Sequence, residues 1–196
     1  MSRQETERKS TIKAVARKLF KQYGFRKTSL DDIARIAGVT KTTLYHYYPN
    51  KEAIFDDIVY EDALDIFNRI DANLDAALPA DKKFIQFGRL LLKELQAHAE
   101  ELKHVPENLI EYSPHGRPII EKIKLIFRQR LESILQEGIA QGIFQSPNVQ
   151  ITLDALVAMG DFIRMPWLID NPPEYCQQVF EEFQRLVLDG LRTREK

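Results

Sequence analysis

The stretch from Thr28 to Lys51 constrains the fold of this chain more than any other feature. It holds two residues of the type that caps the start of a helix, Ser29 and Thr40, and each precedes a short amphipathic run. Gly38 lies between the runs, where the chain must reverse, and glycine takes the left-handed backbone conformation without steric cost. The stretch therefore predicts a helix-turn-helix.

The first helix of this motif is expected to begin after Ser29, with Asp32 at the third helical position completing a capping box. Its inner face is expected to consist of Ile33, Ala34 and Ala37. Because Ala34 is small, it suits a position where two helices cross closely.

The second helix, from Lys41 to Tyr48, contains one plainly aliphatic residue, Leu44. Its expected outward surface consists of Lys41, Thr42, Thr43, Tyr45, His46 and Tyr47. A helix that reads base edges and phosphates needs such a large polar surface, whereas a purely structural helix needs a wider apolar face. Helix-turn-helix corners also occur by chance in helical proteins, so the spacing alone leaves both interpretations open.

The distribution of charge favours the nucleic-acid interpretation. Residues 1–51 contain 12 Lys and Arg against 4 Asp and Glu, whereas the remaining residues contain 16 against 25. The formal net charge of −1 thus conceals a basic end and an acidic remainder. A basic end attracts the phosphate backbone through counterion release, so we expect the N-terminal part to bind double-stranded DNA.

Apolar residues at helical spacing dominate the rest of the chain, and no run shows the alternation of a strand. A stripe from Ile12 to Phe20 predicts an N-terminal helix that ends at Gly24. Further helices are expected over residues 51–74, 81–102, 118 to 138 or 142, 148–169 and 173–191, with a short one around 108–112. The predicted fold is all-α, with a three-helix DNA-binding domain over residues 1–50 and a helical body over residues 51–196.

Length and composition fit a globular protein with a substantial core, since the 196 residues are 44% apolar and 29% charged. The charged N-terminus is not followed by an apolar signal run, and no stretch approaches the roughly 18 apolar residues of a membrane span. We therefore expect a cytoplasmic location and no membrane partner. Cys176 is the single cysteine, which excludes an internal disulfide and favours a buried structural thiol over a redox sensor.

The sequence motifs do not indicate an enzyme, a metal site or a cofactor. Glu101 and His104 have the Glu-x-x-His spacing of carboxylate-bridged di-iron bundles, but such a site needs a second copy, which the sequence lacks. The phosphate-binding loop, the Gly-x-Ser-x-Gly turn, the His-Glu-x-x-His motif and the glycine-rich dinucleotide turn are also missing. We expect no catalytic residues, no metal and no cofactor.

The helix-turn-helix, the run LYHYYPNKEAIF from Leu44 to Phe55 and the all-helical body together resemble the TetR family of bacterial transcription regulators. The resemblance is specific over residues 8–58 and only architectural beyond them. It implies a homodimer that binds a palindromic DNA operator, and a cavity in the body for a small-molecule effector.

The resemblance also implies roles for individual residues of the motif. The positions that match the family's base-reading set are Lys41, Thr42, Thr43 and Tyr45, and those that match its phosphate contacts are Thr28, Ser29, His46, Tyr47 and Lys51. A lysine at position 41 suits the acceptor atoms of guanine, with a plain phosphate contact as the alternative. Tyr48 is expected in the core, because it follows Leu44 by about one helical turn.

Two further sites are expected in the body. Aromatic side chains at helical spacing more often fill a core than line a pocket. Those in the body are nevertheless the candidates for an effector pocket: Phe67, Phe84, Phe87, Tyr112, Phe127, Phe162 and Trp167. This lining favours an apolar or amphipathic effector, with Arg89, Arg128 or Arg164 available to anchor a carboxylate. The candidate dimer interface is a stripe on the last two helices: Ala155, Met159, Ile163, Val179, Phe183, Leu186, Val187 and Gly190.

These expectations lead to one function and one alternative. The chain is expected to be a transcriptional repressor that a small apolar or amphipathic effector releases from its operator. The alternative is a constitutive DNA-binding accessory protein whose body only dimerises or recruits another protein. A solidly packed body favours the alternative, whereas a cavity or a copurifying small molecule favours the repressor.

Overall fold

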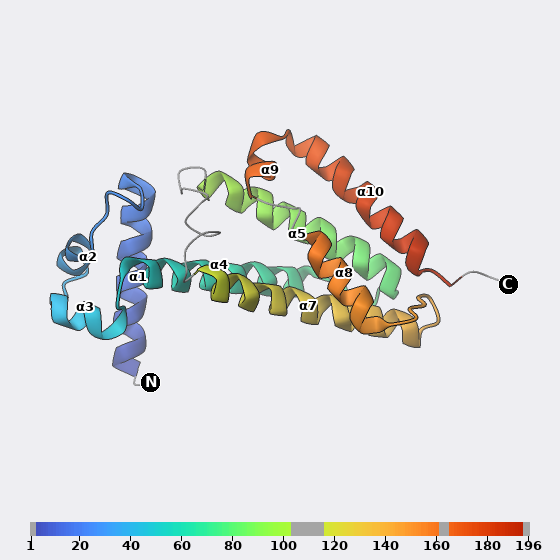
Figure 1. The fold of residues 1–196 in the computed structure, drawn as a ribbon, viewed down its shortest axis with the longest axis horizontal. Helices are drawn as coiled ribbons and strands as arrows, with labels where there is room; N and C mark the ends of the chain where they lie inside the picture. The colour runs from blue at the N-terminus through green and yellow to red at the C-terminus, as the bar shows by residue number, and fades with distance from the viewer. Residues whose placement is uncertain (1–2, 103–115, 161–164, 194–196) are drawn as a thin grey trace. The chain divides into compact units, whose positions relative to one another are not determined.

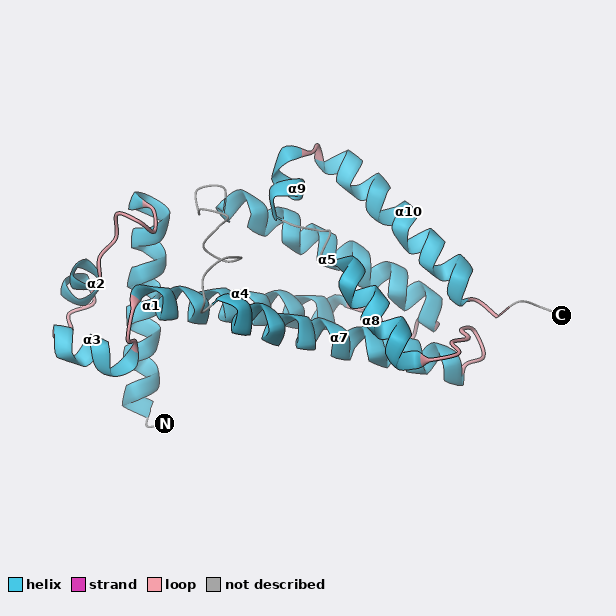
Figure 2. Cartoon of the chain, viewed as in Figure 1, coloured by secondary structure: helices cyan, strands magenta, loops and turns pink. Residues whose placement is uncertain are grey.

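The structure, a computed structural model, describes residues 3–102, 116–160 and 165–193 (Figure 1). In these ranges the regular elements are helices (Figure 2). They are accompanied by an isolated β-bridge between Phe144 and Arg192. The helices are α1 (Arg3–Tyr23), α2 (Leu30–Ile36), α3 (Lys41–Tyr47), α4 (Lys51–Asn73), α5 (Ala80–Leu102), α7 (Gly116–Ala140), α8 (Val149–Gly160), α9 (Met165–Asp170) and α10 (Pro173–Leu191). The prediction of an all-α fold is confirmed.

The chain packs as two units. The first comprises residues 1–64 and 101–122, and the second comprises residues 65–100 and 123–196. Helix α4 contributes residues to both units, because it begins at Lys51 and ends at Asn73.

The first unit is organised around an apolar cluster to which α1, α2, α3 and the first turns of α4 contribute. Its buried members are Ile12, Ala16, Leu19, Phe20, Phe25, Ile33, Ala34, Leu44, Tyr48, Ile54, Phe55 and Ile58. The rings of Phe20, Phe25 and Phe55 contact one another with centroids 5.1 to 5.9 Å apart. The core of the helix-turn-helix therefore extends past residue 50, the expected domain boundary, as far as Ile58.

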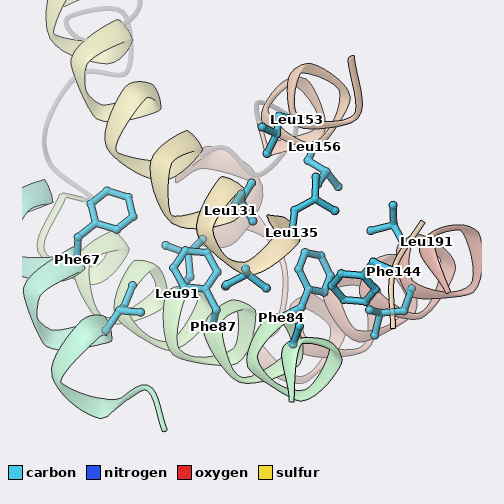
Figure 3. Packing of buried hydrophobic residues seen from close by; sticks show 14 of the residues in the cluster. Phe67, Phe84, Phe87, Leu91, Leu131, Leu135, Phe144, Leu153, Leu156 and Leu191 are labelled. Carbon is cyan, nitrogen blue, oxygen red and sulfur yellow. The ribbon is translucent and has the colours of Figure 1, made fainter. Parts of the chain in front are cut away.

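The second unit is built around a larger cluster, to which α4, α5, α7, α8 and α10 contribute (Figure 3). Phe67, Phe84 and Phe87 belong to it, with only 2 to 6% of each residue exposed. The ring of Phe87 stacks on that of the half-buried Phe127, with centroids 6.0 Å apart. Aliphatic side chains fill the space between these rings and the neighbouring helices: Leu91, Leu131, Ile134, Leu135, Leu153, Leu156 and Leu191.

Two polar contacts fix α5 within the second unit. The nearly buried Lys83 ammonium donates to both carboxylate oxygens of Glu137 on α7, at 2.6 and 2.8 Å. The buried side-chain amide of Gln184 on α10 donates to the backbone oxygen of Phe84 at 2.7 Å. Gly88 makes this approach possible, because a Cβ atom there would lie 2.3 Å from the Gln184 amide nitrogen. These contacts fix the register of α5 against α7 and α10.

The observed helix boundaries follow the predicted ones except near residue 160. The sequence predicts one helix over residues 148–169, where the structure describes two helices, α8 up to Gly160 and α9 from Met165, with the residues between them outside the described ranges. The short helix predicted around residues 108–112 lies outside the described residues. Among the helices described, none is long and apolar enough to span a membrane.

Candidate nucleic-acid interface

Helix α2 begins as the capping pattern predicts. The Ser29 hydroxyl accepts the backbone N–H of Asp32 at 3.1 Å and donates to the Asp32 carboxylate at 2.5 Å. The bond from Ser29, followed by one from Arg35, lowers the pKa of Asp32. After the helix, Gly38 takes a φ of +68°, so the predicted glycine turn is confirmed.

Helix α3 presents most of its side chains outward. Thr40 caps the helix by accepting the backbone N–H of Thr43 at 3.1 Å, and the fully buried Leu44 anchors it. On the remaining surface Lys41, Thr42, Tyr45 and His46 are exposed, while Thr43 and Tyr47 are half-buried. The surface that the sequence predicts for recognition is therefore open along α3.

The predicted base-reading residues differ in the bonds that they already make. Thr42 and Tyr45 are exposed, Tyr45 by 46%. The Thr43 hydroxyl lies 2.7 Å from the hydroxyl of the capping threonine, so a base contact must share or replace this bond. The Lys41 ammonium lies within 3.0 Å of both carboxylate oxygens of Asp31 on α2, and this pairing raises the pKa of Lys41.

The predicted phosphate contacts divide into open and occupied side chains. Ser29 and His46 are exposed, and the half-buried Tyr47 lies edge-on to the His46 ring with centroids 5.3 Å apart. Thr28, by contrast, is only 4% exposed, and its hydroxyl donates to the backbone oxygen of Gly24 at 2.9 Å. This bond holds the turn between α1 and α2, so a phosphate contact of the Thr28 hydroxyl must share or replace it.

Lys51, the first residue of α4, holds the same turn. Its ammonium donates to the backbone oxygens of Phe25 and Thr28 at 2.6 and 2.8 Å, and it lies 4.3 Å from the centroid of the Phe25 ring. Burial lowers the pKa of Lys51. Because two of its three N–H donors are used in these bonds, we infer that Lys51 clamps the turn, and the phosphate contact predicted for it must use the third donor.

Tyr48 is buried as predicted, and it also makes a polar link that the sequence pattern does not indicate. Its hydroxyl donates to the carboxylate of Asp57 on α4 at 2.6 Å, and the Lys9 ammonium lies 5.3 Å from its ring centroid. Burial first, and then the bond to Asp57, raise the pKa of Tyr48 well above its usual range. The end of α3 is thus fastened to α4 within the first unit.

Part of the positive charge of α1 is used inside the first unit. Lys13 donates to Glu61 at 3.0 Å and Arg17 donates to Asp62 at 2.6 Å, and both acids belong to α4. The charge imbalance of the sequence therefore overstates the number of cations that are open to DNA. Exposed basic side chains near the end of α1 and in the following turn are Lys18, Lys21, Arg26 and Lys27.

Comparison with known proteins identifies the motif. Residues 12–58, from α1 into α4, match the family described as bacterial regulatory proteins, tetR family. The HTH-type transcriptional regulator RutR of Escherichia coli O157:H7 is 41% identical, over 98% of this chain and 94% of that protein. The chain belongs to the tetR family. It is therefore a DNA-binding transcriptional regulator and not an enzyme.

Other relatives of this TetR-family regulator agree over nearly its whole length. The HTH-type transcriptional repressor KstR2 of Mycolicibacterium smegmatis is 25% identical over 96% of this chain and 92% of that protein. The crystal structure of a TetR-family transcriptional regulator from Syntrophomonas wolfei has a TM-score of 0.73 at 20% identity, covering 97% of this chain and all of that one.

The aromatic residues predicted to line an effector pocket lie mainly in the core of the second unit. Phe67, Phe84 and Phe87 are buried there, and Phe127 and Trp167 are half-buried. Tyr112 and Phe162 lie outside the residues whose side chains are described. Three of the seven aromatic side chains thus contribute to packing, as the alternative interpretation of the sequence expects.

The arginines suggested as carboxylate anchors in this regulator have partners within the second unit. Arg89 lies 3.4 Å from Glu181, and Arg128 donates to Asp154 at 2.5 Å and to Gln150 at 2.7 Å. A ligand carboxylate must therefore compete with these groups. Arg164 and the Glu101–His104 pair lie outside the side chains that are described.

The predicted dimer stripe lies largely on the surface of the second unit. Ala155, Met159, Val179, Leu186 and Gly190 are exposed, Phe183 and Val187 are half-buried, and Ile163 lies outside the described residues. Met159 is 44% exposed and Leu186 is 57% exposed. Ile151 on α8 and Tyr175 on α10, which the sequence-based prediction did not include, are also exposed, by 63 and 50%. A single chain therefore leaves several large apolar side chains of α8 and α10 in water.

Proposed function

We propose that this regulator is a homodimeric repressor that binds a palindromic operator and is released by a small apolar or amphipathic effector. The observation that carries the proposal is the open surface of α3, which the Thr40 cap and the buried Leu44 hold in place. Lys41, Thr42 and Tyr45 on this surface are of types that meet base edges in the major groove. The phosphate-binding candidates of the same motif include the exposed Ser29 and His46 and the half-buried Tyr47.

The exposed apolar side chains of α8 and α10 support the dimer. Two copies of this stripe can bury Met159, Val179 and Leu186 in a four-helix interface. Twofold symmetry then presents two copies of α3 to one DNA duplex. The two helices must lie about 34–36 Å apart, or further by whole turns of DNA, and symmetry of this kind requires a palindromic operator.

The second unit is the proposed site of the effector, within the region from Phe67 to Trp167. Phe127 and Trp167 support this placement, because they are aromatic and only half-buried. The name of the relative KstR2 describes a repressor, which supports repression as the output. An effector that releases almost all bound DNA must favour the non-binding conformation by about 5.5 kcal/mol. Operator DNA must then weaken effector binding by the same factor.

One observation favours the alternative, a constitutive DNA-binding accessory protein. Phe67, Phe84 and Phe87 fill a packed core in which leucine and isoleucine side chains surround them (Figure 3). A body packed in this way can serve dimerisation alone, without binding an effector.

Selection of bound fragments from random-sequence DNA with the purified full chain tests the DNA-binding part of the proposal. We expect enrichment of one palindrome whose half-site centres lie about 10 base pairs apart, or a multiple of this spacing. Enrichment of unrelated sequences, or of a single asymmetric site, contradicts a homodimer on a palindromic operator.

Denaturing mass spectrometry of natively purified protein tests the effector. We expect a small apolar or amphipathic molecule to copurify, and we expect it to bind more weakly when the selected operator is present. A copurifying molecule that binds equally well with and without operator is not an inducer, and this result favours the accessory protein.

A further inference from the structure

Asp31 places a negative charge on the helix-turn-helix beside a predicted base-reading residue. It lies in the first turn of α2, and its carboxylate oxygens are 2.9 and 3.0 Å from the ammonium of Lys41, the first residue of α3. The pair thus connects the two helices of the motif across ten residues of sequence. Both side chains are open to solvent, Asp31 by 63% and Lys41 by 59%.

The stability of the motif accounts for Asp31 only in part, because a carboxylate in the first turn of α2 interacts favourably with the helix dipole. Ser29 already caps α2 by accepting the N–H of Asp32, and Asp32 also pairs with Arg35. An ion pair as exposed as that between Asp31 and Lys41 contributes little to folding, because water and salt screen it. A carboxylate at a surface that meets phosphates also repels DNA. The helix dipole explains an acidic residue in this turn, but it does not explain why Asp31 is paired with Lys41 on the predicted recognition helix.

We propose that Asp31 is a specificity-determining residue, which withholds Lys41 from phosphates and joins it in reading guanine and cytosine. A lysine ammonium donates to O6 and N7 of guanine, and a carboxylate accepts a hydrogen bond from the N4 amino group of cytosine. A donor and an acceptor held side by side therefore match a G·C pair, or a guanine next to a cytosine, in the major groove. The inference rests on the proposed role of α3 as the recognition helix.

The same pair is a poor ligand for phosphates. Its carboxylate is repelled by the DNA backbone, and the charge of Lys41 is already balanced within the protein. Binding to arbitrary DNA depends on the number of cations that replace counterions at phosphates. Asp31 thus lowers the affinity for arbitrary DNA and, by accepting a hydrogen bond from cytosine, raises the affinity for a matching sequence, so the ratio of the two affinities becomes larger.

The test compares Asp31→Asn with the wild type, as full chains, on two duplexes. One duplex is the sequence that the wild type selects from random DNA, and the other is a scrambled duplex of equal composition. Asparagine keeps the size of the side chain and removes its charge, so Lys41 becomes free to contact a phosphate. We expect affinity for the scrambled duplex to rise about threefold or more, and its log–log salt slope to steepen by about 0.9. We expect affinity for the selected duplex to fall by about fivefold or more.

Two further variants serve as controls. Asp65→Asn changes the net charge equally at an exposed position of α4 in the second unit, and we expect it to leave both affinities within about twofold. Lys41→Ala is expected to weaken binding to the selected duplex and to change binding to the scrambled one little. A second selection with Asp31→Asn is expected to lose the preference for one cytosine in each half-site.

The outcomes separate this inference from the proposed function. If Lys41→Ala weakens binding to the selected duplex but Asp31→Asn changes neither the ratio of affinities nor the salt slope, the role of Asp31 is refuted and the proposed function stands. If Lys41→Ala also has no effect, or if the wild type enriches no sequence, the role of Asp31 and the assignment of α3 both fail. Circular dichroism of Asp31→Asn is expected to match the wild type, because the variant removes only an exposed ion pair.

Discussion

Replacing Lys51 by methionine tests how the structure holds the turn between α1 and α2. Methionine keeps the apolar stem of the side chain but cannot donate to the backbone oxygens of Phe25 and Thr28. Hydrogen bonds from a charged donor contribute about 1.5–3 kcal/mol each, and the partial exposure of Lys51 reduces the two together to about 2 kcal/mol. The loss of the contact with the Phe25 ring adds about 0.5–1 kcal/mol. We therefore expect the free energy of unfolding to fall by about 2–3 kcal/mol.

Thermal and urea unfolding of the full chain, followed by circular dichroism, measure this loss. For a chain of this size, it corresponds to a decrease in Tm of about 4–12 °C. Lys27→Met is the matched control, because Lys27 is an exposed lysine in the same turn, and we expect it to stay within about 0.5 kcal/mol of the wild type. Well below its Tm, Lys51→Met is expected to bind DNA with the salt slope of the wild type.

The opposite pattern refutes this reasoning. If Lys51→Met unfolds with wild-type stability while its salt slope on DNA decreases by about one, Lys51 contacts a phosphate in the complex. The bonds to Phe25 and Thr28 then contribute nothing measurable to folding.

Three other changes have definite expected results. Because the pKa of Tyr48 is raised in the folded protein, its bond to Asp57 stabilises the fold fully below the ordinary tyrosine pKa of 10.0, and this stabilisation is lost as the pH rises above that value. The free energy of unfolding of the wild type should therefore fall with pH in that range, and that of Tyr48→Phe should fall less steeply. Leu186→Asp should yield monomers in sedimentation velocity, because it places a charge in the proposed interface. Gln178→Asp should stay dimeric, because Gln178 is exposed about 100° around α10 from Val179. A dimeric Leu186→Asp would place the interface elsewhere. Gly88→Ala should destabilise the second unit by about 1–3 kcal/mol in urea unfolding, and wild-type stability would show that α5 and α10 separate freely.

Local features of the motif could be predicted because they depend on residues a few positions apart. The caps at Ser29 and Thr40, the turn at Gly38 and the burial of Leu44 and Tyr48 all follow from side-chain chemistry within one or two helical turns. The structure confirms each of them.

Contacts between distant residues could not be predicted in the same way. Lys51 reaches back 23 and 26 residues to its two carbonyl partners, and Arg17 pairs with Asp62, 45 residues away. Helical periodicity indicates that such charged residues lie on the polar face of their helix, but it does not indicate whether that face meets solvent, another helix or DNA. The sequence therefore does not reveal that Lys51 is bonded to the turn or that Arg17 is paired with Asp62.

The body illustrates a second limit. Aromatic residues at helical spacing show the same sequence pattern whether they line a pocket or fill a core. The burial of each side chain distinguishes the two roles, and burial is known only once the fold is known. Phe84 and Phe87 prove to be core residues.

The most direct test of the central claim, that α3 reads DNA sequence, is the affinity of Tyr45→Ala and Lys41→Ala for the selected operator and for a scrambled duplex. Both side chains are exposed on α3. We predict that each variant loses about 1–3 kcal/mol of binding free energy on the operator and much less on the scrambled duplex. An equal loss on both duplexes, or no loss on either, would contradict the claim that α3 is the recognition helix.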